Sequence, residues 1–389
     1  MRTTPLLHRV CIRFLLAGLI IIIVGFSGGL RAEEQSRIWI TPQGSEAGNL
    51  VLHWQSENAG DSRLRIGKAG AALVEANVAT ENGIFHAEIP VGKSGDVWCY
   101  QIGDGQVRNV NGWGGKALRI AFVADWHGNA QPGSEAILRD DPQLLVTAGD
   151  NVTSLHNKGK EGIKAYAALV ESAPELFARV PVMPVVGNHD NEIRPRGKTP
   201  PTEAVYDVTA ETFRMFFGLP EDGWRRPFQI PAHGISLVAL DLHHTSDFGT
   251  TWQTGHAFDA ESDQLKWLQE IVANDPSPFR IFIYNEQNSR VRTLASGAFG
   301  KAFRERTGVA VTGFGGYTER AEWEGFPSYN THIHGGGTDY ADSHRAFATG
   351  KGAYLLLTHI AGEETIRIEI KNHAGEVLDT RVISVKPGG

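Results

Sequence analysis

Residues 118–129 read LRIAFVADWHGN, a run of apolar residues that ends abruptly in Asp125, His127 and Asn129. A continuous apolar run without polar alternation is typical of a strand that is buried on both faces of a sheet. In open α/β sheets, ligands bind in the loops beyond the carboxyl ends of the strands. This stretch therefore predicts a layered α/β domain with polar side chains gathered at one edge of its sheet.

Two further apolar runs end in the same way. Residues 143–148 (QLLVTA) are followed by GDN at 149–151, and residues 181–186 (PVMPVV) are followed by GNHD at 187–190. Each cluster taken singly would be an ordinary turn, because Gly, Asn and Asp are the usual turn formers. Three in succession at strand ends instead favour a metal site, since carboxylates and imidazoles are costly to bury unless they are paired or bound to metal.

The rest of the chain after residue 118 continues the layered pattern. Buried strands are predicted at 118–124, 144–148, 180–186, 235–240, 280–284 and 309–312, and helices at 163–178 and 261–273. The tail alternates at 353–360, 365–371 and 377–384, with a turn at 373–375, which predicts edge strands that complete a sheet.

The segment before residue 118 has a different pattern of apolar and polar residues. Short alternating runs separated by Gly, Asn, Asp and Ser between residues 36 and 112 predict a small β-sandwich. Residues 109–115 (NVNGWGG) read as a linker.

Residues 1–32 have the three regions of a secretory signal. Arginines come first, an apolar run follows at 14–26, and small residues precede Leu30-Arg31-Ala32. The apolar run is short for a membrane span, and an uncleaved N-terminal anchor is the alternative. Either way we expect a secreted or periplasmic protein, with no stable membrane span once the signal is removed.

Charge limits the partners. The full chain has 37 basic and 44 acidic side chains, and loss of the four signal arginines leaves 33 against 44, a net charge of −11. That sign argues against nucleic acid and anionic membranes as partners. It does not argue against a phosphorylated substrate, because a bound cation would invert the local field. The oligomeric state is left open.

The runs VADWHGN, TAGDN and VGNHDN resemble the Asp-x-His, Gly-Asp and Gly-Asn-His-Asp/Glu motifs of the calcineurin-like metallophosphoesterases. Four further segments, FRMFFGLPEDGW, LVALDLHH, QLKWLQEIVAND and GEVLDTRVI, resemble the secreted subgroup that carries a fibronectin-like domain, as purple acid phosphatases do. The resemblance implies a signal peptide at 1–32, a fibronectin-like β-sandwich domain at 36–115 and a metallophosphoesterase domain at 117–386. Thr153 stands where purple acid phosphatases have an iron-binding tyrosine, which disfavours the iron-tyrosinate form.

The resemblance also implies roles for the motif residues. Asp125 and His127 would hold a first metal, and Asp150 would bridge to a second that also takes the amide oxygen of Asn188. His189 would stabilise or protonate the leaving group of a phosphate-ester substrate, with Asp190 as its orienting partner. Such ligands suit manganese, zinc or iron(II), and the sequence leaves both the metal and the number of ions, one or two, open.

The second half of the family pattern is missing. The histidine expected after residues 280–284 is replaced by Asn285, followed by Glu286, and the expected Gly-His-x-His reads Gly313-Phe314-Gly315-Gly316. The second metal then keeps only Asp150 and Asn188. Candidate replacements are Glu286 and the histidines of a predicted strand, His332 and His334, which are equally readable as ordinary sheet residues.

Other polar residues have two readings each. His243 and His244 follow a predicted strand and are either site or surface residues, and Trp126 and Arg320 either line a substrate pocket or cap a core and pair on a surface. Three functions stay open for the chain. They are an exported metal-dependent phosphoesterase with a His-depleted second site, a pseudoenzyme that binds a partner or glycan, and a working N-terminal sandwich on a scaffold domain.

Overall fold

The computed structural model describes residues 37–56, 59–194, 205–243 and 255–385. The predicted signal at 1–32 and His244 lie outside them. These described residues belong to one compact unit, Ser36–Gly389. None of the helices in the described ranges is long and apolar enough to cross a membrane.

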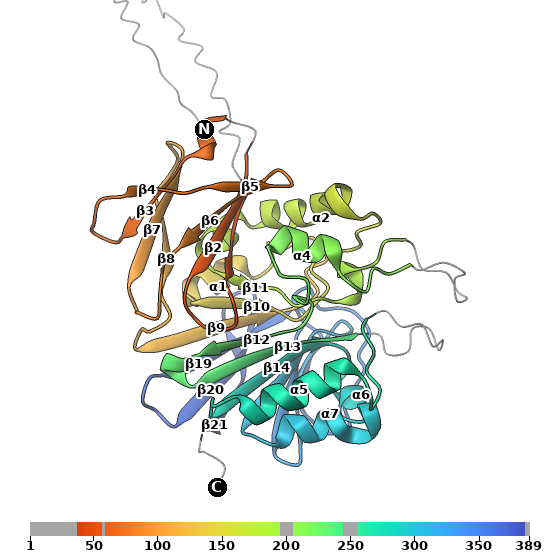
Figure 1. Cartoon of the computed structure of the whole chain (residues 1–389). Coiled ribbons are helices and arrows are strands. Elements are labelled where there is room, and N and C mark those ends of the chain that lie inside the picture. Colours follow the sequence, from red (N-terminus) through yellow and green to blue (C-terminus); the bar gives the residue numbers. More distant parts are fainter. Residues whose placement is uncertain (1–36, 57–58, 195–204, 244–254, 386–389) are drawn as a thin grey trace, which may run out of the picture. The chain divides into compact units, whose positions relative to one another are not determined.

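Two large sheets make up the main body (Figure 1). The first has the order β11 (Val182–Met183), β10 (Leu144–Thr147), β9 (Ala117–Val123), β19 (Ala353–Ile360), β20 (Thr365–Asn372), β21 (Val377–Ser384). The second has the order β12 (Arg226–Ile230), β13 (Ile235–His243), β14 (Phe279–Asn285), β15 (Gly308–Thr312), β17 (Phe326–Asn330), β16 (Thr318–Trp323), β18 (Arg345–Thr349). Strands β9 to β11 are parallel to one another, as are β13, β14, β15 and β17.

Helices cover the outer faces of both sheets. The helical segments are α1 (Ser134–Asp140), α2 (Gly159–Ser172), α3 (Pro174–Arg179), η2 (Asn188–Asp190), α4 (Glu211–Phe217), η3 (Pro231–His233), α5 (Asp263–Asn274), α6 (Asn288–Val291) and α7 (Leu294–Arg304). Helices α1 to α4 pack with the outer face of β9 and β10, and α5 and α7 with that of β13 and β14.

Alternation along the strands explains the continuous apolar runs. In β9, Ile120 and Phe122 face the space between the two sheets, while Ala121 and Val123 face the helices. In β14, Ile281 and Ile283 face inward, and Phe282 and Tyr284 pack under α5 and α7. Both faces of each strand are therefore apolar, as strands covered on both sides require. The predicted layered metallophosphoesterase fold, a β-sheet sandwich flanked by helices, is confirmed.

An all-β region precedes this body, as predicted. One sheet contains β1 (Arg37–Pro42), β2 (Leu50–Gln55), β6 (Ile84–Ile89) and β5 (Ala79–Glu81). The other contains β4 (Val74–Ala76), β3 (Leu64–Lys68), β7 (Val97–Ile102) and β8 (Arg108–Asn111), and a short helix, η1 (Ala59–Ser62), follows β2. Its fibronectin-like character and the boundary at residues 115–117 stay predictions.

This region is tied firmly to the helices of the main body. Trp39 is fully buried, stacks on Phe216 of α4 at 4.2 Å, and its indole N–H donates to the Phe216 carbonyl. The hydroxyl of Tyr100 donates to the carbonyl of Ala178 in α3. We infer that the all-β region packs against these helices and helps to hold them in place.

Three local predictions were wrong. The helix at 163–178 is two helices, because Pro174 lacks an N–H and starts α3 after the non-helical Ala173. The linker at 109–115 overlaps β8, and its Trp113 is buried with the indole N–H donating to the carbonyl of Gly48. Of the three tail strands only β21 is an edge strand, since β19 pairs with β9 as well as β20.

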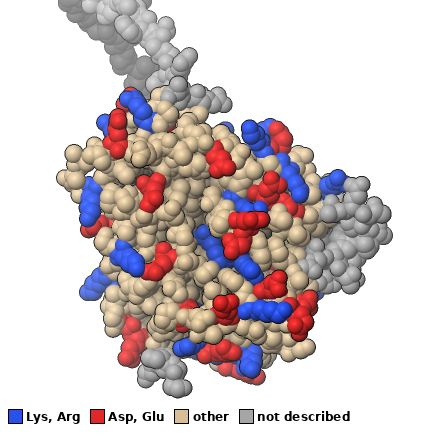
Figure 2. All heavy atoms as spheres, viewed as in Figure 1, with Lys and Arg blue, Asp and Glu red and all other residues tan. Residues whose placement is uncertain are grey.

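Charged side chains of both signs are interspersed over the face shown in Figure 2. Many form exposed pairs, such as Lys68 with Asp96 and Lys164 with Glu161. Such exposed pairs contribute little to stability, because water and salt screen the charges.

Candidate metal centre

Backbone hydrogen bonds join the loops that follow β9 and β10. The N–H groups of Asp125, His127 and Gly128 donate to the carbonyls of Gly149, Asp150 and Asn151, at 3.2, 3.1 and 2.9 Å. The two motifs are thus held in register by the main chain. The sequence predicted that the two motifs lie close together because the ends of parallel strands meet at one edge of a sheet, and β9 and β10 are parallel neighbours.

Three of the predicted ligands adopt left-handed backbone conformations. The φ angles are 56° at Asp125, 46° at His127 and 54° at Asp150. Non-glycine residues rarely have positive φ, although Asp and His tolerate it better than most. Such strain persists only where surrounding structure fixes it, and it is common at functional sites.

Asp125, His127 and His332 form a group that fits one metal ion. Each offers a ligand atom within 4.8 Å of the others. The Nε2 atom of His127 lies 3.6 Å from Asp125 Oδ1, and that of His332 lies 3.4 Å from Asp125 Oδ2. Two ligand atoms bound tetrahedrally at about 2.1 Å would be roughly 3.4 Å apart, so the spacing matches a shared ion.

His332 arrives from outside the predicted motifs. It lies in the loop after β17, not on a strand as predicted, and this loop is tied to β9 because the N–H of Ile333 donates to the carbonyl of Ala124 at 3.1 Å. Burial, with added repulsion from His127 and His334, lowers the pKa of His332 to about 4. The ring is therefore neutral at pH 7, as a metal ligand must be.

Of these three residues His332 is the weakest candidate ligand, because its Nδ1 atom already accepts a hydrogen bond. The N–H of Gly335 donates to His332 Nδ1 at 2.7 Å, so the neutral ring carries its proton on Nε2. Ligation through Nε2 would transfer that proton to Nδ1 and break this bond. His334 is committed elsewhere, because its Nε2 donates to the carbonyl of Trp126 at 3.0 Å.

Buried carboxyl groups surround Asp150. Burial, and then the Asp150 carboxyl group, raise the pKa of Asp125 well above its usual value and that of Asp190 to about 7. Asp125 Oδ2 has no hydrogen-bond partner among the described residues. Adjacent buried carboxyl groups are stable only when they share a proton or face a cation. The donor set therefore fits a bound divalent metal.

Asn188 also fits. It is fully buried, and neither atom of its amide has a hydrogen-bond partner within the described ranges. Leaving such a group unsatisfied costs about 1–3 kcal/mol, unless a ligand satisfies it.

His189 lies beside this cluster, with its ring 5.0 Å from that of His127. Its Nδ1 is 2.5 Å from the carbonyl oxygen of Thr153 and 3.5 Å from the Glu192 carboxylate. A carbonyl only accepts, so Nδ1 carries the proton and Nε2 is the reactive nitrogen. Thr153 was singled out only as the residue at the position of the iron-binding tyrosine, and the contact of its carbonyl with His189 was not predicted. Glu192 was not predicted, because it lies outside the motifs.

Asp190 does not orient His189. Its Oδ2 accepts from the N–H of Gly187 at 2.8 Å and from the amide of Asn151, and its Oδ1 lies 3.1 Å from the hydroxyl of Tyr166. The predicted role was wrong because the side chain turns back into the loop. Asp190 instead holds the Gly187 and Asn151 segments together.

The second half of the site contains Asn285 and no imidazole from the expected positions. The Nδ2 group of Asn285 donates to the carbonyls of Ala148, at 2.9 Å, and Gly313. Glu286 is fully buried but its Oε1 accepts from the N–H of Gln287 at 2.7 Å, and its other oxygen lies 3.9 Å from Arg290. Glu286 therefore faces α6, and nothing in these contacts makes it a replacement ligand.

Trp126 and Arg320 have structural contacts. Trp126 is buried and packs against Phe177, and Arg320 pairs with Asp379 and Glu322 on the sheet. For His243 the surface alternative was wrong, because this residue is buried with its Nε2 atom 2.8 Å from Asp241 Oδ1. The Asp241 carboxylate raises the pKa of His243 against the opposing effect of burial.

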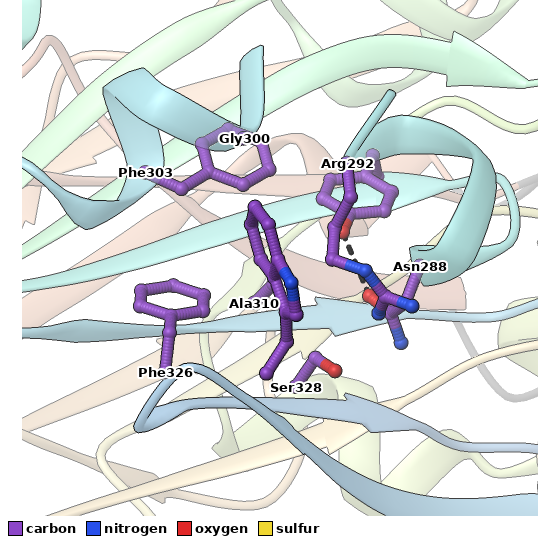
Figure 3. A pocket seen from close by; sticks show the side chains of 9 residues that line it. Asn288, Arg292, Gly300, Phe303, Ala310, Phe326 and Ser328 are labelled. Atoms are coloured by element: carbon purple, nitrogen blue, oxygen red, sulfur yellow. Dashed lines mark hydrogen bonds between the residues drawn. The ribbon is translucent and has the colours of Figure 1, made fainter. Parts of the chain in front are cut away.

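Two hollows lie away from these residues. Figure 3 shows one under α6 and α7, where Tyr284 donates to Asn288 and the side chains of Phe303 and Phe326 close the walls. It leaves about 10 Å³ for the centre of a water molecule, room for about one water. The other, of about 410 Å³, is lined by residues of α2, among them Lys164, and by residues of the all-β region, among them Arg37. None of the predicted site residues lines either.

Residues 118–307 match the family model described as Calcineurin-like phosphoesterase, so this part of the chain is a calcineurin-like phosphoesterase domain. Comparison with curated proteins gives no match. The solved structure titled "Structure of PhoD" is similar with a TM-score of 0.61 and 12% identity, covering 89% of this chain and 88% of that one. At this identity the likeness supports the fold alone.

Two further solved structures are more distant. GAP50, the anchor in the inner membrane complex of Plasmodium, has a TM-score of 0.45 and 14% identity, covering 70% of this chain and 90% of its own. A dimetal phosphatase from Danio rerio has a TM-score of 0.43 and 13% identity, covering 69% of this chain and 99% of its own.

The structure predicts that the missing histidine at Gly316 cannot be restored. A Cβ atom there would lie 1.8 Å from the Cα of Gly337, a backbone atom that has no side-chain freedom to move away. We expect Gly316→His to lower the free energy of unfolding by about 1–3 kcal/mol or more, measured by urea denaturation. Gly350→Ala is the control, because no heavy atom lies within 4 Å of its added Cβ. Equal stability of the two variants would contradict this close approach.

Proposed function

We propose that this chain is an exported, metal-dependent phosphoesterase whose second metal position is atypical and contains no histidine from the usual motifs. The observation that carries the proposal is the cluster of Asp125, His127, Asp150 and Asn188 at the ends of β9, β10 and the segment after β11. Two of these side chains have buried oxygen atoms with no hydrogen-bond partner among the described residues. A hydrolase that binds no cation would gain nothing from that arrangement.

Asp125, His127 and Asp150 would hold the first cation, with His332 as a further candidate, and Asn188 would contribute to the second. When bound, divalent ions at such a site supply Lewis-acid polarisation of the phosphate oxygens and a water of lowered pKa.

The chain's own residues provide the proton. The Thr153 carbonyl fixes the His189 proton on Nδ1, and the Glu192 carboxylate lies 3.5 Å from the same nitrogen. Nε2 is therefore the nitrogen that would carry a proton to the leaving-group oxygen of the substrate. The side chain of His189 is 20% exposed, so a substrate from solvent reaches it.

Main-chain groups orient the bridging carboxylate. The N–H of His189 donates to Asp150 Oδ1 at 3.0 Å, which joins η2, the segment of the proposed proton donor, to the loop after β10 that carries Asp150. A shift of η2 would therefore disturb the contact with Asp150. Positioning of this kind contributes to rate because reacting groups are held in place before the reaction.

The competing function is a pseudoenzyme that keeps the fold for binding. It is favoured by the absence of imidazoles at Asn285, Phe314 and Gly316. The two functions differ in whether the chain hydrolyses a phosphate ester with bound metal, so one experiment separates them.

We expect the purified protein to contain divalent metal and to hydrolyse p-nitrophenyl phosphate with Mn²⁺, Zn²⁺ or Fe²⁺ added. Asp150→Ala should lower kcat/KM at least about 100-fold, or roughly 2.7 kcal/mol, because it removes the bridging carboxylate. Asp104→Ala is the control, since the Asp104 side chain is 86% exposed and belongs to the all-β region. No bound metal and equal rates for all three proteins would leave the pseudoenzyme as the function.

His189→Gln should lower kcat about 100-fold for an alkyl phosphate, because the poor leaving group needs a proton from Nε2. The loss should be smaller for p-nitrophenyl phosphate, whose leaving group departs without one. Bound metal, measured by elemental analysis, should be unchanged. The exposed His344→Gln serves as control. Equal losses for both substrates would argue against proton donation by His189.

Export rests on residues 1–32. Expressed in a secreting host, the protein should appear outside the cytoplasm and begin at Glu33, as read by intact mass or N-terminal sequencing. Ala32→Arg should keep the longer N-terminus, because a large charged residue blocks cleavage. A wild-type chain that keeps Met1 in the membrane fraction would support the uncleaved anchor instead.

A further inference from the structure

Asn285 occupies the end of β14, where the family pattern would place a histidine. Both hydrogens of its Nδ2 group point at carbonyl oxygens, those of Ala148 and Gly313. Flipping the amide would set Oδ1 against these two oxygens, so the orientation is fixed by the hydrogen bonds. Oδ1 is then directed away from both carbonyls. It is buried and has no hydrogen-bond partner among the described residues.

This oxygen lies near Asp150 and near the segment that carries Asn188. A Cβ atom built on Gly187 would lie 3.0 Å from Asn285 Oδ1 and 2.3 Å from Asp150 Oδ1, so both oxygens flank the residue that precedes Asn188. The Asn188 amide, equally buried, is likewise unsatisfied within the described part of the chain. Two buried, unsatisfied amides are costly if nothing binds them.

We propose that Asp150, Asn188 and Asn285 hold a second cation through oxygen atoms alone, and that this cation is a hard one such as Mn²⁺, Mg²⁺ or Ca²⁺. The inference rests on the proposed phosphoesterase function and names the ligands of its second metal. Carboxylate and amide oxygens suit these ions, whereas imidazole suits zinc and iron. Asn285 is then a substituted ligand, and the second half of the site is remodelled.

The two cation positions would differ in chemistry while sharing Asp150. The first has imidazole nitrogens from His127 and His332 beside Asp125. The second has no nitrogen ligand among Asp150, Asn188 and Asn285. Metal preference should therefore separate them, with the nitrogen-containing position retaining transition metals and the oxygen position exchanging with Mg²⁺ or Ca²⁺.

The rival explanation is that Asn285 only ties the end of β14 to the ends of β10 and β15 through its two hydrogen bonds. That role needs the Nδ2 group but leaves Oδ1 unexplained. It predicts that loss of Asn285 reduces stability and leaves the number of bound ions unchanged.

Mn²⁺ titration of the metal-free full chain, followed by electron paramagnetic resonance, tests the proposal. The wild type should bind two Mn²⁺ with a spin-coupled spectrum, because both ions contact Asp150. Asn285→Ala should bind the second Mn²⁺ at least about tenfold more weakly and show an uncoupled spectrum, since even outer-shell substitutions cost about 10–100-fold in affinity.

Asn288→Ala is the matched control. This buried asparagine is three residues further along, and its amide oxygen accepts from the hydroxyl of Tyr284 (Figure 3). Its Nδ2 group donates to the carbonyl of Tyr329, so both of its partners are outside the proposed ligand set. It should keep two coupled Mn²⁺. Circular dichroism and thermal unfolding establish that both variants are folded.

If Asn285→Ala fails to fold, a measurement on the wild type alone still tests the proposal. Excess Mg²⁺ or Ca²⁺ should displace one of the two Mn²⁺ ions and abolish the coupling. Two coupled Mn²⁺ ions in Asn285→Ala, a single Mn²⁺ in the wild type, or equal displacement of both ions would overturn the oxygen site. Hydrolysis that still depends on Asp150 would leave the phosphoesterase standing, whereas loss of both binding and hydrolysis removes both proposals.

Discussion

Buried carboxyl groups at the meeting of two sheets are the constraint on which the site depends. Asp125, Asp150 and Asp190 are each less than 10% exposed, and burial raises the pKa of Asp125 and Asp190. The structure offsets this for Asp190 with N–H and hydroxyl donors from Gly187, Asn151 and Tyr166. Asp125 lacks such a set for its Oδ2 atom in the described residues. The difference divides the acids, since Asp190 has donors from the protein, whereas Asp125 Oδ2 would require a shared proton or a bound cation.

The sequence predicted the parts of the site that depend on strand ends. Asp125, His127 and Asp150 come together because β9 and β10 are parallel neighbours, and neighbouring strands are readable from apolar runs. The direction of a side chain within a loop is not readable in this way. Asp190 is next to His189 in sequence yet turns toward Asn151 and Tyr166, and His332 lies beside Asp125 because hydrogen bonds such as that from Ile333 to Ala124 hold its loop there. These contacts join residues far apart in sequence, which no local pattern encodes.

The all-β region likewise could be predicted from the sequence only in part. Its alternation was readable, because half-buried strands carry period-two patterns. The predicted linker was not one, since Gly112 and Gly114 allow close backbone contact with residues 93–96, and Trp113, between them in sequence, is buried. Glycine and asparagine suggested a loop, but here the glycines permit a tight approach. The all-β region therefore continues into the core around β9 with Trp113 as part of the packing.

The second half of the site is better explained by remodelling than by decay. A decaying site loses contacts, and its former ligand positions become exposed or loosely packed. Here Asn285 is buried with two hydrogen bonds, and Gly316 approaches Gly337 so closely that no side chain fits. The His-x-His loop has thus been exchanged for a backbone contact, and the chain carries Asn285 where an imidazole would stand. Because an amide oxygen and a carboxylate bind hard cations, such an exchange would change the preferred ion while keeping Asp150 in place.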